Sequence, residues 1–299
     1  MSGWRLVRLA SADGRARVGL VDPADAGTIA LLDDDDALGV LAAGDLAARA
    51  ADAVERVAVA DPESLDPAEG HVLLAPVQPL ECWAAGVTYE RSRDARLEES
   101  SASDVYAMVY DADRPEIFLK DAACRRTVGP NAPLGVRADS TWTVPEPELA
   151  LVIGEGGAIL GYTVGNDVTA RDVEGANPLY LPQAKLFANA GSIGPAVLVP
   201  DDPAAPLAIE LRAWGADGQL VVDTATSTAQ MKRSTAELVE WLLRDNPVPP
   251  GSVLYTGTGI VPADDFALAP GMRTEVRIPG IGTLRNPVRA AGELIAGRP

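Results

Sequence analysis

Three acidic residues, Glu146, Glu148 and Asp167, have the type and spacing of a binding site for a divalent metal ion. Glu146 and Glu148 lie two residues apart, and side chains on a β-strand alternate between faces, so both point to one face. Oxygen-only ligands favour magnesium, calcium or manganese over zinc. The alternative is a solvated acidic rim, because the chain holds 43 acidic residues. Spacing alone leaves both interpretations open.

A β-hairpin is the element that must bring these carboxylates together. Apolar runs at 149–153 and 159–164 flank Gly156-Gly157, a pair typical of tight hairpin turns. A two-residue turn there places Gly165 opposite Glu148 and Asp167 opposite Glu146. Pro145 and Pro147 lack backbone donors, which indicates an edge strand or the start of a strand. A slip of one residue would turn Asp167 to the other face.

Composition restricts the classes of partner. The chain has 299 residues, 47% of them hydrophobic, and a net charge of −18, so nucleic acid and anionic membrane surfaces are disfavoured. No signal-peptide core or membrane-spanning run is present in the sequence, and we expect a cytoplasmic protein with a small-molecule partner. Cys82 and Cys124 show no metal-type spacing, which predicts reduced packing residues.

Two scarce residue types narrow the chemistry. The one histidine, His71, lies in a proline-rich stretch, so Ser-His-Asp, Cys-His and histidine-ligated zinc chemistry are disfavoured. Lysine occurs only at 120, 185 and 232, whereas arginine fills the other basic positions. A lysine amine can lose its proton and a guanidinium cannot. We therefore treat Lys120 and Lys185 as candidate site residues and Lys232 as a surface residue.

The elements around the hairpin suggest two parts. Residues 1–75 predict a small N-terminal α/β domain with strands at 4–9 and 17–21 and a helix and short strand over 38–59. Prolines over 61–79 mark the boundary, and residues 76–299 form the second domain. The elements expected in that domain are strands at 81–87 and 114–120, helices at 90–99, 104–110 and 235–244, a hairpin over 207–222, and a loop over 171–180.

Two segments of the second domain bear on the site. The strand at 114–120 places Glu116, Phe118 and Lys120 on one face. The glycine-rich turn at 256–259 suits the close approach of backbone and threonine hydroxyls to a small anion, although an ordinary turn is the alternative.

Residues 80–290 resemble the fumarylacetoacetate hydrolase superfamily. The resemblance rests on EPEL at 146–149, GYTVGND at 161–167, Lys185 and TGT at 256–258, in that order. It implies an α+β, β-rich fold: a β-sandwich roll with a small N-terminal α/β domain. It also implies Mg²⁺, or Ca²⁺ or Mn²⁺, on the three carboxylates, and a homodimer or homotetramer.

One departure from the superfamily's pattern is informative. Hydrolases of this superfamily follow a Gly-x-Asn-Tyr strand end with a histidine and, three residues later, a glutamate that activate water. Here Ser92 and Ala95 stand at those positions. This variation resembles the branch that dehydrates 2-keto-3-deoxy sugar acids in pentose degradation, converting 2-dehydro-3-deoxy-D-arabinonate to 2,5-dioxopentanoate through a metal-stabilised enolate.

That resemblance implies roles for five further residues. Lys185 would be the base and Glu116 the acid that protonates the leaving hydroxyl, while Lys120, Thr258 and Ser92 would bind substrate. Lys185 as a permanently charged anion binder, Glu116 as a surface carboxylate and Thr258 as a plain turn residue are the alternatives. Competing functions are a C–C hydrolase of acylpyruvates or an oxaloacetate-type decarboxylase, and a non-catalytic binding protein with a structural metal.

Overall fold

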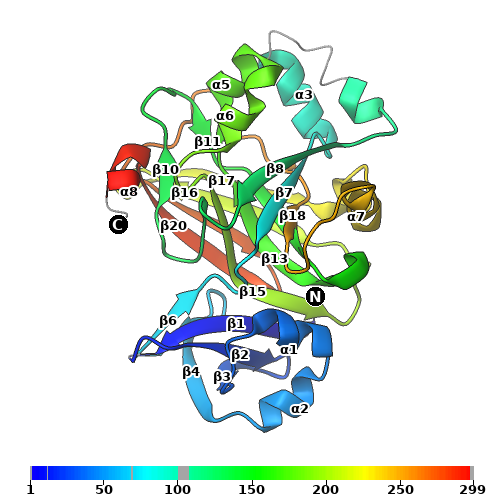
Figure 1. The fold of residues 1–299 in the computed structure, drawn as a ribbon. Helices are drawn as coiled ribbons and strands as arrows, with labels where there is room; N and C mark the ends of the chain where they lie inside the picture. Colours follow the sequence, from blue (N-terminus) through cyan, green and yellow to red (C-terminus); the bar gives the residue numbers. More distant parts are fainter. Residues whose placement is uncertain (1, 12, 69, 100–107, 297–299) are drawn as a thin grey trace.

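The fold is built on one long mixed sheet that runs through the whole molecule (Figure 1). The computed structural model describes residues 2–11, 13–68, 70–99 and 108–296. In spatial order, the strands of the main path are β5 (Asp66–Pro67), β4 (Glu55–Asp61), β3 (Asp25–Leu31), β2 (Ala16–Asp22), β1 (Gly3–Ser11), β15 (Gly191–Pro200), β13 (Ile159–Asp167), β12 (Pro147–Ile153), β18 (Val253–Tyr255), β7 (Glu81–Gly86) and β8 (Glu116–Ala122). Two short strands join at the side: β6 (His71–Leu74) pairs with β1, and β9 (Thr127–Val128) pairs with β15.

A second sheet of five strands packs on the middle of the first. Its order is β10 (Leu134–Val136), β20 (Gly282–Ala290), β19 (Arg273–Ile278), β16 (Ala208–Trp214) and β17 (Leu220–Ser227). Leu151 and Val164 of the long sheet share a buried cluster with Leu211 and Val276 of the second sheet. Burial of these side chains is the main contribution that holds the two layers together. The expected β-rich α+β sandwich is confirmed.

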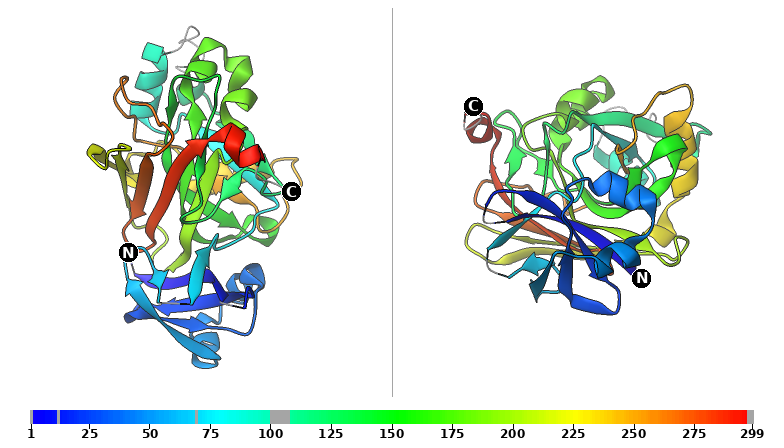
Figure 2. Two further views of the ribbon diagram at one scale, coloured as in Figure 1. Left: turned by 90° about the vertical axis from the view of Figure 1, so that its left-hand side faces the viewer. Right: turned by 60° about the horizontal axis from the view of Figure 1, so that its bottom comes forward.

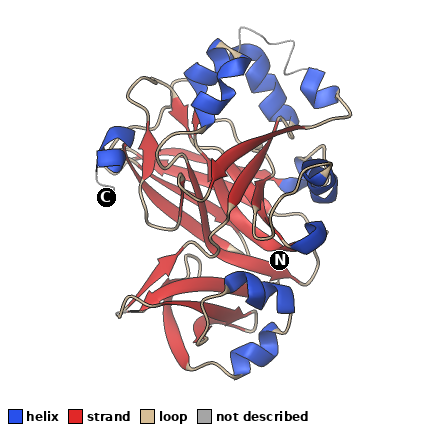
Figure 3. Cartoon of the chain, in the orientation of Figure 1, coloured by secondary structure: helices blue, strands red, loops and turns tan. Residues whose placement is uncertain are grey.

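The helices lie at the periphery, as Figure 3 shows in blue. They are α1 (Ala37–Ala43), α2 (Leu46–Ala51), α3 (Glu90–Glu99), α5 (Arg171–Ala176), α6 (Leu181–Lys185), α7 (Thr235–Leu243) and α8 (Ala291–Ala296). The expected helix at 235–244 is confirmed, and the Ser234 hydroxyl caps it by accepting from the Glu237 amide. The expected helix at 104–110 falls mostly outside the described residues. No helix within the described ranges has the length and apolarity needed to cross a membrane.

The N-terminal unit, residues 2–75, carries β1 to β6 with α1 and α2, and lies at the lower end of the molecule (Figure 2, left, blue). Its first strand pairs with β15, with Leu6 opposite Val197. Leu6 and Val40 of this unit also share a core cluster with Ala150 and Val253. Sheet and core therefore continue across residue 75, and the division into domains 1–75 and 76–299 stays a prediction.

The hairpin that carries the carboxylates has the expected register but a different turn. Glu148 pairs with Gly165, and the Asp167 amide donates to the Glu146 carbonyl at 2.9 Å. The two-residue turn was wrong: a three-residue 3₁₀ turn (Glu155–Gly157) joins the strands, and a bulge leaves Leu160 unpaired. The extra residue in the bulge compensates for the longer turn and restores the register. Pro147 begins β12, an interior strand, so of the two interpretations the strand start is confirmed.

The prediction of a loop over 171–180 is also wrong. This segment forms α5 and a 3₁₀ turn (Pro178–Tyr180), and α6 follows directly. Pro178 and Pro182 each occupy the first turn of a short helical segment. Proline is favoured there because the first helical amides have no intrahelical partner. The two prolines therefore mark helix starts and not a continuous loop.

Candidate metal centre and active site

The three carboxylates converge as the hairpin predicts. Each of Glu146, Glu148 and Asp167 offers an oxygen, and these oxygens all lie within 4.8 Å of one another. All three side chains are at most 3% exposed. Asn166 helps to hold the arrangement, because its side-chain oxygen accepts from the Glu146 amide at 3.0 Å. Such crowding of buried carboxylates is costly unless a cation is present.

Among the described residues, the cations Lys185 and Arg171 hold Glu146. Lys185, at the end of α6, donates from Nζ to Glu146 Oε2 at 2.6 Å, to Asp167 Oδ2 at 2.8 Å and to Thr169 Oγ1 at 2.7 Å. Arg171, at the start of α5, donates from Nη2 to Glu146 Oε1 at 2.7 Å. Both are almost fully buried, so each ion pair acts in a region of low dielectric.

Lys120 reaches the centre from β8. Its Nζ lies 2.5 Å from Asp167 Oδ1 and donates to the Val168 carbonyl at 2.9 Å. Burial lowers the pKa of Lys120, and the charge of Asp167 opposes that shift. A bulge, which pairs Cys82 with Asp121 and Trp83 with Leu119, leaves Lys120 unpaired between them. Lys120 is 1% exposed and contacts Asp167 without lining the cavity.

Glu148 is held differently from its two neighbours. Among the described residues its hydrogen bond comes from the Gly257 amide, 2.5 Å from Oε2. Burial raises the pKa of Glu148 well above its usual range, and the negative charges of Asp167 and Glu146 raise it further. The centre thus contains a carboxylate whose ionised form lacks sufficient positive charge nearby.

A divalent cation fits this imbalance. Counted over the described residues, the nearly buried carboxylates of the centre are Glu146, Glu148, Asp167 and Glu174. They face the cations Lys120, Lys185 and Arg171, which leaves a formal charge of minus one within this part of the chain. The donor set is all oxygen, as Mg²⁺, Mn²⁺ and Ca²⁺ prefer. The residues present therefore fit a hard divalent metal ion on Glu146, Glu148 and Asp167.

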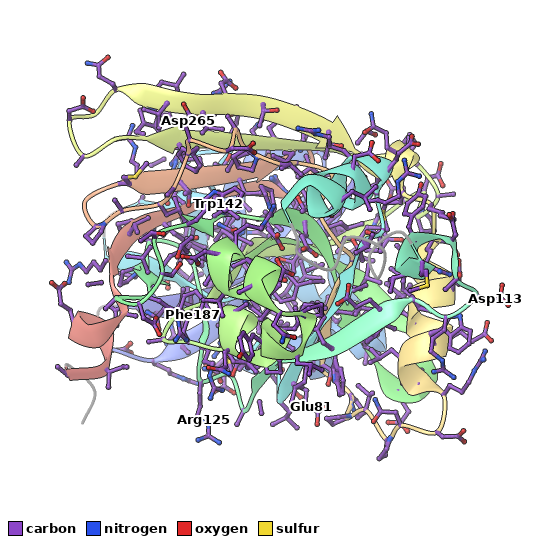
Figure 4. All side chains as sticks on the ribbon, turned by 90° about the horizontal axis from the view of Figure 1, so that it is seen from above. Glu81, Asp113, Arg125, Trp142, Phe187 and Asp265 are labelled. Carbon is purple, nitrogen blue, oxygen red and sulfur yellow. The ribbon has the colours of Figure 1, made fainter. Side chains whose placement is uncertain are left out.

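A small cavity opens onto this centre. It has a volume of about 20 Å³, and the polar side chains lining it include Glu116, Ser92, Thr258, Glu174 and Lys185. That space accommodates about one water molecule. Helices α3 and α5, which supply Ser92 and Glu174, lie above the sheets in Figure 1, and the view from above in Figure 4 shows α5 and α6 in green over the middle of the fold.

The candidate residues separate into two groups. Lys185, Glu116, Ser92 and Thr258 all line the cavity beside the three carboxylates. Lys120 contacts the centre through Asp167 and is not among the residues that line the cavity. Lys232 is a partly exposed surface lysine, as expected, paired with Asp111.

A glycine makes room for Glu116. A Cβ atom at Gly86 would lie 2.0 Å from Glu116 Oε2. Because Gly86 has no side chain, the carboxylate of Glu116 can rest against the end of β7 and face the cavity. The sequence places Glu116 on the correct face of its strand, and Gly86 explains how the carboxylate is accommodated.

Sequence reasoning missed several contributors, chiefly Arg171, Glu174 and Thr169. A period-two pattern extended beyond Asp167 would have placed Thr169 on the same face. Arg171 and Glu174 gave no such signal, because the chain has many arginines and glutamates and their segment was interpreted as a loop. Both residues lie on α5, which brings Arg171 to Glu146 and Glu174 to the wall of the cavity.

The sandwich fold and its buried all-oxygen centre define a metal-dependent enzyme. Residues 82–289 match the protein family described as "Fumarylacetoacetate (FAA) hydrolase C-terminal". The chain belongs to the fumarylacetoacetate hydrolase family.

Two relatives and one solved structure show which members of the family this chain resembles. The chain is 52% identical over 214 residues to the "Probable 2-keto-3-deoxyxylonate dehydratase" of Haloferax volcanii, covering 71% of this chain and 73% of that protein. It is 42% identical over 219 residues to the "2-dehydro-3-deoxy-D-arabinonate dehydratase" of Saccharolobus solfataricus, covering 72% and 73%. A solved structure, "2-keto-3-deoxy-D-arabinonate dehydratase complexed with magnesium and 2,5-dioxopentanoate", superimposes with a TM-score of 0.81 at 35% identity, covering 96% and 99%.

Proposed function

We propose that this chain is a magnesium-dependent hydro-lyase that converts a 2-keto-3-deoxypentonate to 2,5-dioxopentanoate. The observation that carries the proposal is the pairing of a lysine and a glutamate, Lys185 and Glu116, on one cavity with the three-carboxylate centre. The similarity to the dehydratases of Haloferax volcanii and Saccharolobus solfataricus supports it.

Elimination of water from such a substrate needs a base at C3 and an acid at the C4 hydroxyl. When bound on Glu146, Glu148 and Asp167, Mg²⁺ would act as a Lewis acid that stabilises negative charge on the 2-keto oxygen. Lys185 Nζ accepts the C3 proton, and Glu116 donates a proton to the departing C4 hydroxyl, which leaves as water. Reprotonation and tautomerisation then complete the conversion to the dioxo acid.

The surroundings of Lys185 set a condition on its role as base. Its Nζ donates to two carboxylates and a hydroxyl, and these contacts favour the charged ammonium. Lys185 can accept the C3 proton only as a neutral amine, so it must first give up one ammonium proton together with its contacts to Glu146 and Asp167. Thr258 and Ser92 line the same cavity and would bind substrate oxygens, while Lys120 would support the site through Asp167.

Access to the site requires movement. A five-carbon acid is much larger than a cavity of about 20 Å³. The covering helices α3 and α5 contribute Ser92 and Glu174 to the cavity wall, and we infer that they shift when substrate enters. Closure over the substrate would then exclude water from the enolate.

A substrate panel tests the function. The purified protein with Mg²⁺ is offered 2-keto-3-deoxypentonates, acylpyruvates and oxaloacetate, and products are identified by mass spectrometry. We expect 2,5-dioxopentanoate from the pentonate, loss of turnover with excess chelator, and its return with Mg²⁺ or Mn²⁺. C–C cleavage or carbon dioxide release as the sole activity would contradict the proposal.

A lysine pair separates the base role from an anion-binding role. Lys185→Met should lower kcat by about 10²- to 10⁴-fold, the usual contribution of general base catalysis. Mg²⁺ binding should persist or tighten, because the competing ammonium is gone. Lys232→Met is the matched control and should retain wild-type turnover, since Lys232 lies at the surface. An increase in KM with unchanged kcat in Lys185→Met would instead indicate anion binding.

The assembly is a separate proposal. The family resemblance implies a homodimer or homotetramer, and light scattering coupled to size-exclusion chromatography would measure it. A mass equal to one chain of 31.1 kDa at micromolar concentration would contradict this proposal.

A further inference from the structure

A buried hydroxyl next to the active site is linked to one of the metal ligands through a single peptide unit. Thr88 follows β7 and is 1% exposed. Its Oγ1 donates to the Thr256 carbonyl at 2.7 Å. The amide of the same peptide, Gly257 N–H, donates to Glu148 Oε2 at 2.5 Å. The chain of contacts therefore runs from Thr88 through one peptide to Glu148.

The planarity of the peptide couples its two ends. In a trans peptide the carbonyl and the amide N–H point in opposite directions within one plane. A bond that fixes the Thr256 carbonyl toward Thr88 therefore also fixes the direction in which the Gly257 amide points. The next residue allows this orientation, because Gly257 has φ +94°, a region that favours glycine.

Close packing leaves this peptide little freedom to turn. A Cβ atom at Gly257 would lie 2.0 Å from Thr88 Oγ1 and 3.0 Å from the Ala85 carbonyl oxygen. The Thr256 amide and hydroxyl both donate to the Leu149 carbonyl, at 3.0 and 2.8 Å. On the other side, the Thr88 carbonyl accepts from the Lys232 amide at 2.9 Å. Thr88 is thus itself anchored and can act as a fixed point.

Glu148 depends on this amide more than its neighbours depend on any single contact. Glu146 and Asp167 are held by the lysine and arginine side chains, whereas Glu148 receives its hydrogen bond from Gly257. We propose that Thr88 is a positioning residue of the metal centre: its hydroxyl orients the Thr256–Gly257 peptide, which fixes the carboxylate of Glu148 for Mg²⁺. This inference rests on the proposed magnesium site.

The chain offers a matched control. Thr163, on β13, is also fully buried, but its hydroxyl has no hydrogen-bond partner among the described residues. Replacing either threonine by valine removes a hydroxyl at nearly constant volume. If burial alone mattered, the two variants would behave alike. If the peptide contact matters, only the change at 88 affects metal binding.

Calorimetric titration with MgCl₂ alone tests the proposal on wild type, Thr88→Val, Thr88→Ala, Thr88→Ser and Thr163→Val. Loss of a residue that orients a metal ligand usually weakens metal binding by about 10- to 100-fold. We expect that loss in Thr88→Val and Thr88→Ala, and wild-type affinity within about threefold in Thr88→Ser and Thr163→Val. Circular dichroism checks folding, and Thr88→Ala decides the outcome if Thr88→Val does not fold.

A second measurement distinguishes positioning from a structural effect. The Mg²⁺ concentration for half-maximal turnover should rise in Thr88→Val, while saturating Mg²⁺ restores most of kcat. Unchanged Mg²⁺ affinity in Thr88→Val and Thr88→Ala, or equal loss in Thr88→Ser, would overturn the role of the hydroxyl. Absence of Mg²⁺ binding in the wild type would instead overturn the magnesium site itself, and the role of Thr88 with it.

Discussion

The metal centre and a second group of charged residues lower in the molecule use the same kinds of ion pair under opposite conditions. In the second group, here named the arginine clamp, Arg277 and Arg285 of β19 and β20 hold acidic residues of the N-terminal unit. Arg285 contacts Asp61 at 3.1 Å and Asp66 at 3.0 Å. Arg277 contacts Glu63 at 2.9 Å.

Burial separates the two groups. The two arginine side chains of the clamp are 31% and 35% exposed, whereas the lysines and carboxylates of the metal centre are at most 3% exposed. Exposed pairs cost little to form and contribute little, typically about 0–1 kcal/mol each. Buried charges carry a desolvation cost of several kcal/mol per ion.

The difference indicates what each group does. A clamp of exposed pairs can hold two parts of a chain together at small cost, and its carboxylates need no further cation. The metal centre retains an incompletely neutralised set of carboxylates in the interior, an arrangement that stability alone does not favour. Such a cost persists where a bound ion and catalysis require it.

The largest expected effect comes from Glu148→Gln. Without this ligand charge, turnover should fall by on the order of 10³-fold, because Lewis-acid stabilisation is worth several kcal/mol. The metal-free protein should nevertheless become more stable. The pKa of Glu148 is raised by burial and neighbouring charge, so its ionised form destabilises the folded state at neutral pH and a neutral isostere removes that cost.

Urea unfolding in chelator measures the stability change, and steady-state turnover with Mg²⁺ measures activity. A Glu148→Gln protein that is less stable than wild type without metal would contradict the view that this carboxylate is under-neutralised. Retained turnover would remove Glu148 from the set of metal ligands.

Glu146→Gln should change stability in the opposite direction. Glu146 pairs with Arg171 and Lys185, and its replacement leaves both cations buried with less compensation. Breaking a buried pair in this way costs about 3–5 kcal/mol. The measurement is again urea unfolding in chelator, with Glu148→Gln as the matched variant from the same centre. Equal stability changes in the two variants would show that their different partners do not matter.

Breaking the clamp should have a smaller effect. Arg285→Met removes three pairs of a half-exposed side chain, those with Asp61, Asp66 and Glu275. We expect a loss of about 1 kcal/mol in the free energy of unfolding and unchanged turnover, because the clamp lies away from the cavity. Arg212→Met, which breaks one exposed pair with Asp223, is the control and should be near neutral. A loss as large as that in Glu146→Gln would give the clamp a role comparable to the centre.

Asp61 gives the clamp a distinct pH dependence. The Ser64 hydroxyl lowers the pKa of Asp61 most, followed by the Glu63 amide, and Arg285 adds to the shift. A carboxyl whose pKa is depressed by folding stabilises the folded state above its unfolded pKa and loses that contribution as pH falls. The difference in melting temperature between wild type and Asp61→Asn should therefore shrink below about pH 4. A constant difference down to pH 3 would contradict the ionised Asp61 carboxylate as its cause.

The metal ligands could be predicted from the sequence because they lie on one hairpin. Glu146, Glu148 and Asp167 are close in sequence on one hairpin, so strand period and turn position predicted their convergence. The register was correct even though the turn was not, because the bulge at Leu160 offset the longer turn. Local patterns thus sufficed for the metal ligands.

Partners brought from other elements were harder to predict. Arg171 and Glu174 depend on α5, which was interpreted as a loop, and the link from Thr88 to Thr256 spans 168 positions. Long-range contacts of this kind follow from the packing of sheets and helices and leave no periodic signal in the sequence. The same holds for the clamp, where Arg285 meets Asp61 across 224 positions.

Salt provides the finest test of the comparison. The Debye length falls from about 10 Å at 0.1 M to about 3 Å at 1 M, so exposed pairs are screened and buried pairs much less so. The net charge of −18 will shift the stability of every variant in salt, but this background is nearly shared and cancels in differences from wild type. The destabilisation caused by Arg285→Met should therefore approach zero at 1 M NaCl, whereas that caused by Glu146→Gln should change by less than about 0.5 kcal/mol. If both differences collapsed together, water and ions would be reaching the metal centre as freely as the clamp, and the burial that separates the two groups would not hold in solution.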